Sequence, residues 1–302
     1  MFPSFISIVS VYGSYLRRCF ISAGLSSQKI DVDDQTTLHF WGPKKETARK
    51  KPSLVLIHGF GPMAIWQWRQ QVQFLAPHFD VYVPDLVFFG ASKTKSSERS
   101  EVFQAASLAK LLDKLDVKRF HVLGTSYGGF VAYHLAKMLG ERVEKVVIAS
   151  SGVNMRKSDN AALMERAKLD KIEDLMLPAT PKQLRNLMGL SVSKRLNMLP
   201  SFFLNDLINN LYSENRKEKM ELLKGLTLGR DDAVNLSPLQ QEVLIIWGEH
   251  DQIFPVKMAT ELKQVIGKKA RLELIKNASH VPQIEKAGEF NKIVLDFLRA
   301  GS

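Results

Sequence analysis

The stretch FHVLGTSYGG, residues 120–129, decides how the chain folds. Its first four residues form an apolar run typical of a strand, and a helix is predicted from about residue 128 to 139. Between them, Gly124-Thr125-Ser126-Tyr127-Gly128 matches the pattern G-x-S-x-G, which exposes a serine hydroxyl on a sharp turn when a strand precedes it and a helix follows. Glycines on both sides let the two elements approach without a side-chain clash. We therefore predict that Ser126 is a nucleophile and that Gly124 and Gly128 frame its turn.

Strands and helices alternate on both sides of this turn. Short β-branched runs indicate strands buried on both faces, and longer segments with apolar residues three to four positions apart indicate helices. Such alternation predicts right-handed crossovers and a mainly parallel sheet. The expected strands cover residues 37–41, 53–57, 81–83, 146–149, 243–247 and 272–275, and the expected helices cover residues 65–75, 103–115 and 282–298.

The alternation of predicted strands and helices stops in the middle of the chain. Residues 153–237 are rich in leucine, methionine and charge and carry no strand signal, which predicts a helical cap inserted between two halves of the sheet. The α/β core is expected to cover residues 35–152 and 238–302. An apolar segment, residues 1–34, precedes it.

A serine hydroxyl is a poor nucleophile at neutral pH and needs an adjacent base. Two later turns supply partners: GEHDQIFP, residues 248–255, contains Asp251, and NASHVP, residues 277–282, contains His280. The order serine, acid, histidine and these turns resemble the α/β-hydrolase fold family over roughly residues 35–300. The resemblance implies that His280 is the base and that Asp251 holds its imidazole in the right tautomer.

The same resemblance extends to the loop after the predicted strand at residues 53–57. His58-Gly59-Phe60-Gly61 resembles the family's H-G-x-G. Two backbone N–H groups are needed to stabilise a developing oxyanion, and the matching donors are those of Phe60 and Tyr127. His58 is expected to order this loop rather than to touch substrate.

One loop departs from the family pattern. Many relatives have D-x-x-G-x-G-x-S, whereas residues 85–92 read DLVFFGAS and place Phe88 where a glycine is usual. Phe88 and Phe89 either narrow a substrate channel or pack in the interior, and the sequence leaves both readings open.

The predicted activity is that of a serine hydrolase that cleaves a carboxylic ester through an acyl-enzyme, like a carboxylesterase or monoacylglycerol lipase. Methionines and leucines in the cap favour a small or lipophilic acyl substrate. One alternative is carbon–carbon hydrolysis of a meta-cleavage product with the same triad, although that family usually has a tryptophan where this chain has Val281. Arg185 and Arg195 are candidates for binding a substrate carboxylate, although surface positions suit both. Another alternative is a small-molecule, hormone-like receptor.

Charge and composition limit the partners. The net charge is +11, but the 42 lysines and arginines are scattered, so no nucleic-acid partner is expected. The sequence contains no metal-ligand cluster and no glycine-rich phosphate loop, and we expect no metal and no cofactor. Cys19 is the only cysteine, which favours a reducing compartment and a cytoplasmic location.

The N-terminal segment leaves three readings open. Its apolar residues fall near helical spacing and precede Arg17 and Arg18. It is an amphipathic helix in peripheral contact with a membrane, a helix packed on the domain, or a targeting segment. The sequence does not predict the oligomeric state.

Overall fold

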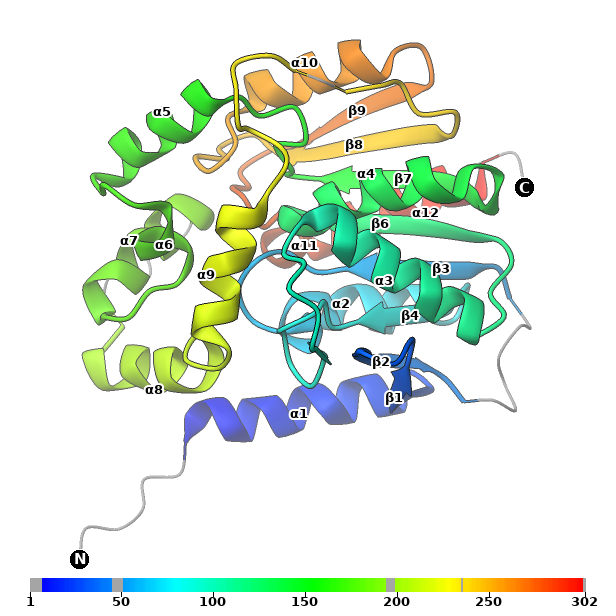
Figure 1. Ribbon diagram of the computed structural model, residues 1–302, viewed down its shortest axis with the longest axis horizontal. Helices are drawn as coiled ribbons and strands as arrows, with labels where there is room; N and C mark the ends of the chain where they lie inside the picture. Colours follow the sequence, from blue (N-terminus) through cyan, green and yellow to red (C-terminus); the bar gives the residue numbers. More distant parts are fainter. Residues whose placement is uncertain (1–6, 45–50, 194–198, 235, 301–302) are drawn as a thin grey trace, which may run out of the picture.

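A nine-stranded, mostly parallel sheet forms the centre of the molecule (Figure 1). The structure, a computed structural model, describes residues 7–44, 51–193, 199–234 and 236–300. The strands follow the order β1-β2-β4-β3-β6-β7-β8-β9, and β5 pairs with β2. All neighbours from β4 onward along this order are parallel, whereas β2 runs antiparallel to its partners. The strands are β1 (Leu25–Asp31), β2 (Thr36–Pro43), β3 (Ser53–Ile57), β4 (Asp80–Pro84), β5 (Lys93–Thr94), β6 (Phe120–Thr125), β7 (Val143–Ala149), β8 (Glu242–Gly248) and β9 (Ala270–Ile275).

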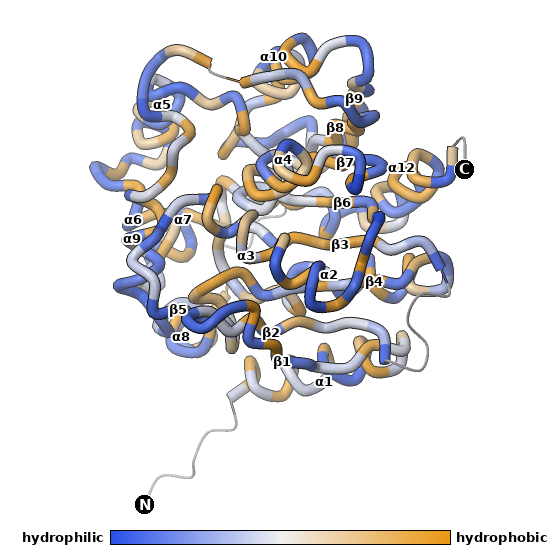
Figure 2. The backbone as a smooth tube through the Cα atoms, turned by 45° about the vertical axis from the view of Figure 1, so that its right-hand side comes forward, coloured by the Kyte–Doolittle hydropathy of each residue, from blue (hydrophilic) through white to orange (hydrophobic). Residues whose placement is uncertain are grey.

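Helices cover both faces of the sheet, so the prediction of a mostly parallel sheet flanked by helices is confirmed. The central strands are buried on both faces, and Figure 2 shows β3 in the hydrophobic colour at the middle of the molecule. Each face has its own apolar core. One is closed by α3 (Glu101–Lys114), α4 (Tyr127–Leu139) and α10 (Val256–Ile266), and the other by α1 (Ile8–Ser22), α2 (Ala64–Leu75) and α12 (Ala287–Arg299).

Among the described residues, five helices lie between β7 and β8 and gather at one end of the sheet (left in Figure 1). This is where the expected cap falls, and the described part of the insertion contains no strand. The limits 153–237 stay a prediction. The helices are α5 (Lys157–Ala167), α6 (Ile172–Met176), α7 (Pro181–Ser191), α8 (Ser201–Leu211) and α9 (Arg216–Gly225).

Two elements differ from the sequence-based expectation. The sequence LSSQKID of β1 is mostly polar and gave no strand signal, yet it pairs with β2 over its whole length as an edge strand with one side partly buried. The expected helix at residues 282–298 is two helices, α11 (Pro282–Glu285) and α12, because the backbone leaves the helical conformation at Lys286. A short 3₁₀ helix, Gly140–Arg142, follows α4. No helix within the described ranges is long and apolar enough to cross a membrane.

The two glycines of the central turn lie where strand and helix touch backbone to backbone. A Cβ on Gly124 would lie 2.1 Å from the carbonyl oxygen of Gly128, and a Cβ on Gly128 would lie 2.3 Å from that of Ile57. Real Cβ atoms do not approach oxygen so closely. Therefore β6, α4 and β3 keep this spacing only with glycine at both positions.

We predict that Gly128→Ala destabilises the fold by about 3 kcal/mol, because the backbone must move apart to admit the methyl group. Thermal unfolding followed by circular dichroism measures the effect. The matched control is Gly288→Ala, since a Cβ there meets no neighbouring atom within 4 Å. Equal unfolding temperatures for the two variants would contradict the argument.

Candidate active site

Ser126 sits on a strained turn between β6 and α4. Its φ of 52° and ψ of −123° lie in a region that residues with a side chain rarely adopt. Two neighbours hold it there: its N–H donates to the carbonyl of Ala149 at 2.9 Å, and its own carbonyl accepts from the Ser151 hydroxyl at 2.6 Å. The strain therefore is balanced by hydrogen bonds from the adjacent strand and the loop after it.

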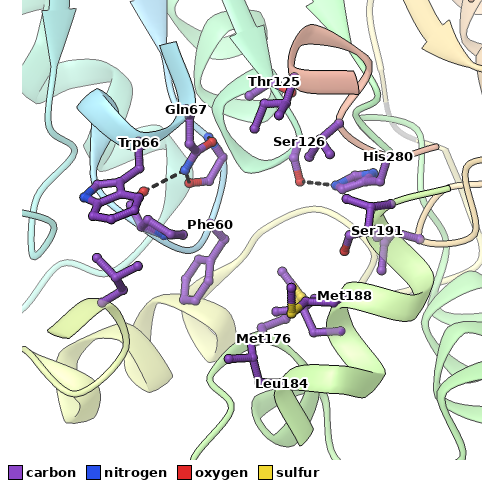
Figure 3. A pocket seen from close by; sticks show the side chains of 18 of the residues that line it. Phe60, Trp66, Gln67, Thr125, Ser126, Met176, Leu184, Met188, Ser191 and His280 are labelled. Carbon is purple, nitrogen blue, oxygen red and sulfur yellow. Dashed lines mark hydrogen bonds between the residues drawn. The ribbon is translucent and has the colours of Figure 1, made fainter. Parts of the chain in front are cut away.

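The structure brings the three predicted catalytic side chains together from three strands. His280, after β9, places Nε2 at 3.0 Å from the Ser126 hydroxyl, and Figure 3 marks this contact. His280 Nδ1 lies 2.9 Å from Oδ2 of Asp251, which follows β8. All three side chains are buried. Their catalytic roles remain a prediction, which this geometry supports.

The carboxylate of Asp251 is fixed on both oxygens. Its Oδ1 accepts the backbone N–H groups of Ile253 and Phe254, both at 2.9 Å, while Oδ2 faces the imidazole. A carboxylate held in this way accepts a hydrogen bond from the protonated Nδ1 of His280. The opposite nitrogen, Nε2, then has a free lone pair toward Ser126. This tautomer is the one a general base requires.

The two predicted oxyanion donors flank Ser126. Tyr127 is the first residue of α4, so its N–H is one of the helix-terminal donors without an intrahelical acceptor. Phe60 belongs to the loop after β3, and this loop passes so close that a Cβ on Gly59 would lie 3.0 Å from the Cβ of Ser126. Among the described residues neither amide has a hydrogen-bond acceptor.

Gln67 on α2 clamps the loop that carries Phe60, a role the sequence analysis did not find (Figure 3). Its amide oxygen accepts the N–H of Gly59 at 2.8 Å, and its amide nitrogen donates to the carbonyls of Gly59 and Pro62 at 3.1 and 2.6 Å. A glutamine on a helix carries no motif, so only the folded geometry shows this contact.

His58 orders the same loop, as expected. It is fully buried, and its Nε2 accepts the backbone N–H of Leu86 at 3.0 Å while Nδ1 lies 2.8 Å from the carbonyl of Gly59. Burial lowers the pKa of the His58 imidazole, so the ring is neutral at pH 7 and carries its proton on Nδ1. His58 does not line the cavity beside Ser126.

Phe88 and Phe89 pack in the interior, which settles the open reading of their loop. Neither lines the cavity. Phe88 has a φ of 72°, the conformation for which a glycine is the usual residue, and its ring lies 4.7 Å from the Arg99 guanidinium. Phe89 packs against His58 and Phe60.

A cavity of about 280 Å³ opens beside Ser126 and His280 between the core and the insertion. None of its described lining residues carries a formal charge, apart from the titratable ring of His280. Arg185 donates to Leu199 and Ser201 and does not line the cavity, and Arg195 lies outside the described residues. The insertion contributes an apolar wall of Met176, Leu184, Leu187, Met188, Leu207 and Leu211.

Comparison with known proteins identifies the family. The family model described as alpha/beta hydrolase fold matches residues 52–287. The chain belongs to this family. Among curated proteins it is similar to a 2-hydroxy-6-oxononadienedioate/2-hydroxy-6-oxononatrienedioate hydrolase of Pseudomonas putida, with 28% identity over 277 residues that cover 89% of this chain and 94% of the relative. With family and relative both named as hydrolases, this member of the alpha/beta hydrolase family is a hydrolase.

Solved structures share the fold. A bacterial membrane phospholipase A superposes with a TM-score of 0.78 at 21% identity, covering 96% of this chain and 90% of the other. The 2-hydroxy-6-oxo-6-phenylhexa-2,4-dienoate hydrolase of Rhodococcus sp. strain RHA1 superposes with a TM-score of 0.76 at 22% identity, covering 91% and 99%. At these identities the likeness concerns the fold alone.

We predict that Ser126→Ala abolishes hydrolysis of a chromogenic ester and that Asp251→Asn lowers kcat by about 10⁴-fold through the wrong histidine tautomer. Both changes are nearly isosteric, so the unfolding temperature serves as the control for folding. Full activity in either variant would overturn the assigned roles.

We also predict that Gln67→Leu lowers kcat at least about tenfold. The loop that carries Phe60 loses three hydrogen bonds, and the N–H of Phe60 is then no longer held in position to stabilise the oxyanion. Steady-state kinetics separate this loss in kcat from a change in KM. The control is Gln73→Leu on the exposed side of the same helix. If both variants keep wild-type kcat, Gln67 does not position the loop.

Proposed function

We propose that this hydrolase cleaves neutral carboxylic esters with an apolar acyl or alkyl group, through an acyl-enzyme on Ser126. The observation that carries the proposal is the cavity wall: it is mostly aliphatic and aromatic, and its described residues offer no lysine or arginine to a substrate. Concave, mainly apolar sites with a few polar groups are typical of small lipophilic ligands.

The proposed reaction follows from the contacts at Ser126. His280 Nε2 takes the hydroxyl proton as Ser126 Oγ attacks the ester carbonyl, and the N–H groups of Phe60 and Tyr127 stabilise the oxyanion. His280 then gives the proton to the leaving alcohol. Water, deprotonated by the same nitrogen, cleaves the acyl-enzyme and restores the hydroxyl of Ser126.

Neutral polar groups in the wall support a neutral substrate. Thr125 and Gln283 line the cavity, and the Thr125 hydroxyl and the Gln283 amide oxygen have no hydrogen-bond partner within the described residues. Burial raises the pKa of Tyr212, another lining residue, to about 12, so it stays a neutral phenol at pH 7.

Carbon–carbon hydrolysis of a meta-cleavage product is the second candidate, and the curated relatives favour it. The P. putida enzyme is named for a dioate substrate, and it covers most of this chain. Both reactions use the same three side chains. The difference lies in the wall, because its described residues include no lysine or arginine and a buried carboxylate without a cationic partner is costly.

The proposal predicts a preference for uncharged acyl groups. We expect p-nitrophenyl hexanoate to be hydrolysed with a kcat/KM at least about 10²-fold above that of the adipate mono-p-nitrophenyl ester, since about 1.4 kcal/mol of carboxylate desolvation accounts for each factor of ten. The two substrates have six-carbon acyl chains and differ only in the terminal carboxylate.

The same assay includes 2-hydroxy-6-oxonona-2,4-dienedioate as a carbon–carbon substrate. Faster turnover of this dioate than of the neutral ester would overturn the proposal in favour of the second candidate. No turnover of any substrate by well-folded protein would favour the receptor reading.

A further inference from the structure

The outer side of α1 carries a second apolar stripe that the described chain leaves largely exposed. Its buried stripe, which includes Leu16 and Phe20, packs on the core. A second stripe faces solvent, and its members stand at positions i, i+3, i+4 and i+7, one face of a helix. They are Ile8, Val11, Tyr12 and Tyr15, each more than 40% exposed.

Helix α8 extends this surface. Its Asp206 carboxylate accepts from the Ser7 hydroxyl and the Val9 N–H, both at 3.0 Å, which fixes α8 beside the start of α1 (Figure 1). Phe202 stands one turn before Asp206 on the same side of α8 and is 69% exposed, the highest value among the large apolar side chains described. The α1–α8 face is defined by Ile8, Val11, Tyr12, Tyr15 and Phe202.

This face adjoins the cavity of the candidate active site. The ring of Tyr12 lies 5.3 Å from that of Trp66, centroid to centroid, and Trp66 lines the cavity. Helix α8 contributes Leu207 and Leu211 to the cavity wall from its other side. A lipophilic molecule held at the face is therefore only one side chain away from the cavity.

Three arginines lie near the Tyr15 end of the face, whereas the Asp206 carboxylate lies near its Phe202 end. Helix α1 carries Arg17 and Arg18, both exposed, and has no acidic residue. From α2, the Arg69 guanidinium lies 5.8 Å from the centre of the Tyr15 ring. Apolar side chains together with tyrosines and flanking arginines are what a helix needs to lie at the boundary between lipid headgroups and acyl chains.

We propose that the α1–α8 face docks on membranes containing anionic lipids and that the ester enters the cavity from there. The docking is argued from the face itself, whereas the entry of the ester rests on the proposed function. A second copy of this chain fits the face less well, because a symmetric dimer would bring its arginines toward their own copies in a protein of net charge +11. Anionic lipid instead complements them.

Vesicle flotation tests the docking. Wild-type protein is expected to float with vesicles of phosphatidylcholine and phosphatidylserine, and more weakly with phosphatidylcholine alone. The variant Val11→Ser/Tyr15→Ser/Phe202→Ser should bind at least about tenfold more weakly, because three side chains no longer bury apolar area in lipid. Arg17→Gln/Arg18→Gln should remove the preference for phosphatidylserine.

The matched control is Val102→Ser/Met138→Ser/Leu274→Ser, which removes three exposed apolar side chains elsewhere on the surface and should float like wild type. Hydrolysis of p-nitrophenyl acetate dissolved in water should be equal in all variants, since none of the changed residues lines the cavity. Hydrolysis of an ester embedded in phosphatidylserine-containing vesicles should fall in the triple face variant and in Arg17→Gln/Arg18→Gln, and should stay at the wild-type rate in the control.

The two proposals fail separately. Ester hydrolysis without flotation overturns the docking and leaves the proposed function standing, and flotation without ester hydrolysis does the reverse. A dimer in light scattering that dissociates in the triple face variant, with no flotation, would show that a second copy covers the face and would overturn the membrane proposal.

Discussion

The backbone strain at Ser126 is the constraint on which the rest of the site depends. A positive φ at a residue with a side chain persists only when neighbours over-determine it, and here the Ala149 carbonyl and the Ser151 hydroxyl do so. The crowding of Gly124 and Gly128 belongs to the same constraint, because β6 and α4 must nearly touch for the turn to close. The strain places the hydroxyl above the sheet, where loops from three other strands reach it.

Those loops are held in place by different hydrogen bonds. Asp251 is held by two backbone N–H groups and in turn holds His280, so the imidazole points at Ser126 without substrate. Gln67 and His58 both hydrogen-bond to Gly59, the residue before Phe60. A site arranged before substrate binds spends little free energy on reorganisation during the reaction. The core therefore positions the predicted catalytic side chains, while the insertion supplies one wall of the cavity beside them.

The sequence predicted the fold, and it singled out the side chains that the structure brings together at the candidate site, because their signals are local. In G-x-S-x-G, the acid turn and the histidine loop, a particular residue type directly follows a strand. A parallel sheet brings the ends of those strands together. The role of Gln67 could not be predicted, because its hydrogen-bond partners depend on how α2 packs against the loop that carries Phe60. The strand β1 escaped because an edge strand buries little, so its polar sequence LSSQKID has no apolar alternation. The apolar side of the cavity is built by side chains from separated helices of the insertion, which no short motif encodes.

Covalent labelling of Ser126 tests the central claim most directly, independently of any chosen substrate. A fluorophosphonate reacts with a serine only where a base activates the hydroxyl and donors stabilise the oxyanion. Mass spectrometry of the digested protein should find one adduct, on the peptide containing Ser126, and the adduct should be lost in His280→Ala. An unlabelled Ser126 in folded wild-type protein, or equal labelling in His280→Ala, would contradict the account.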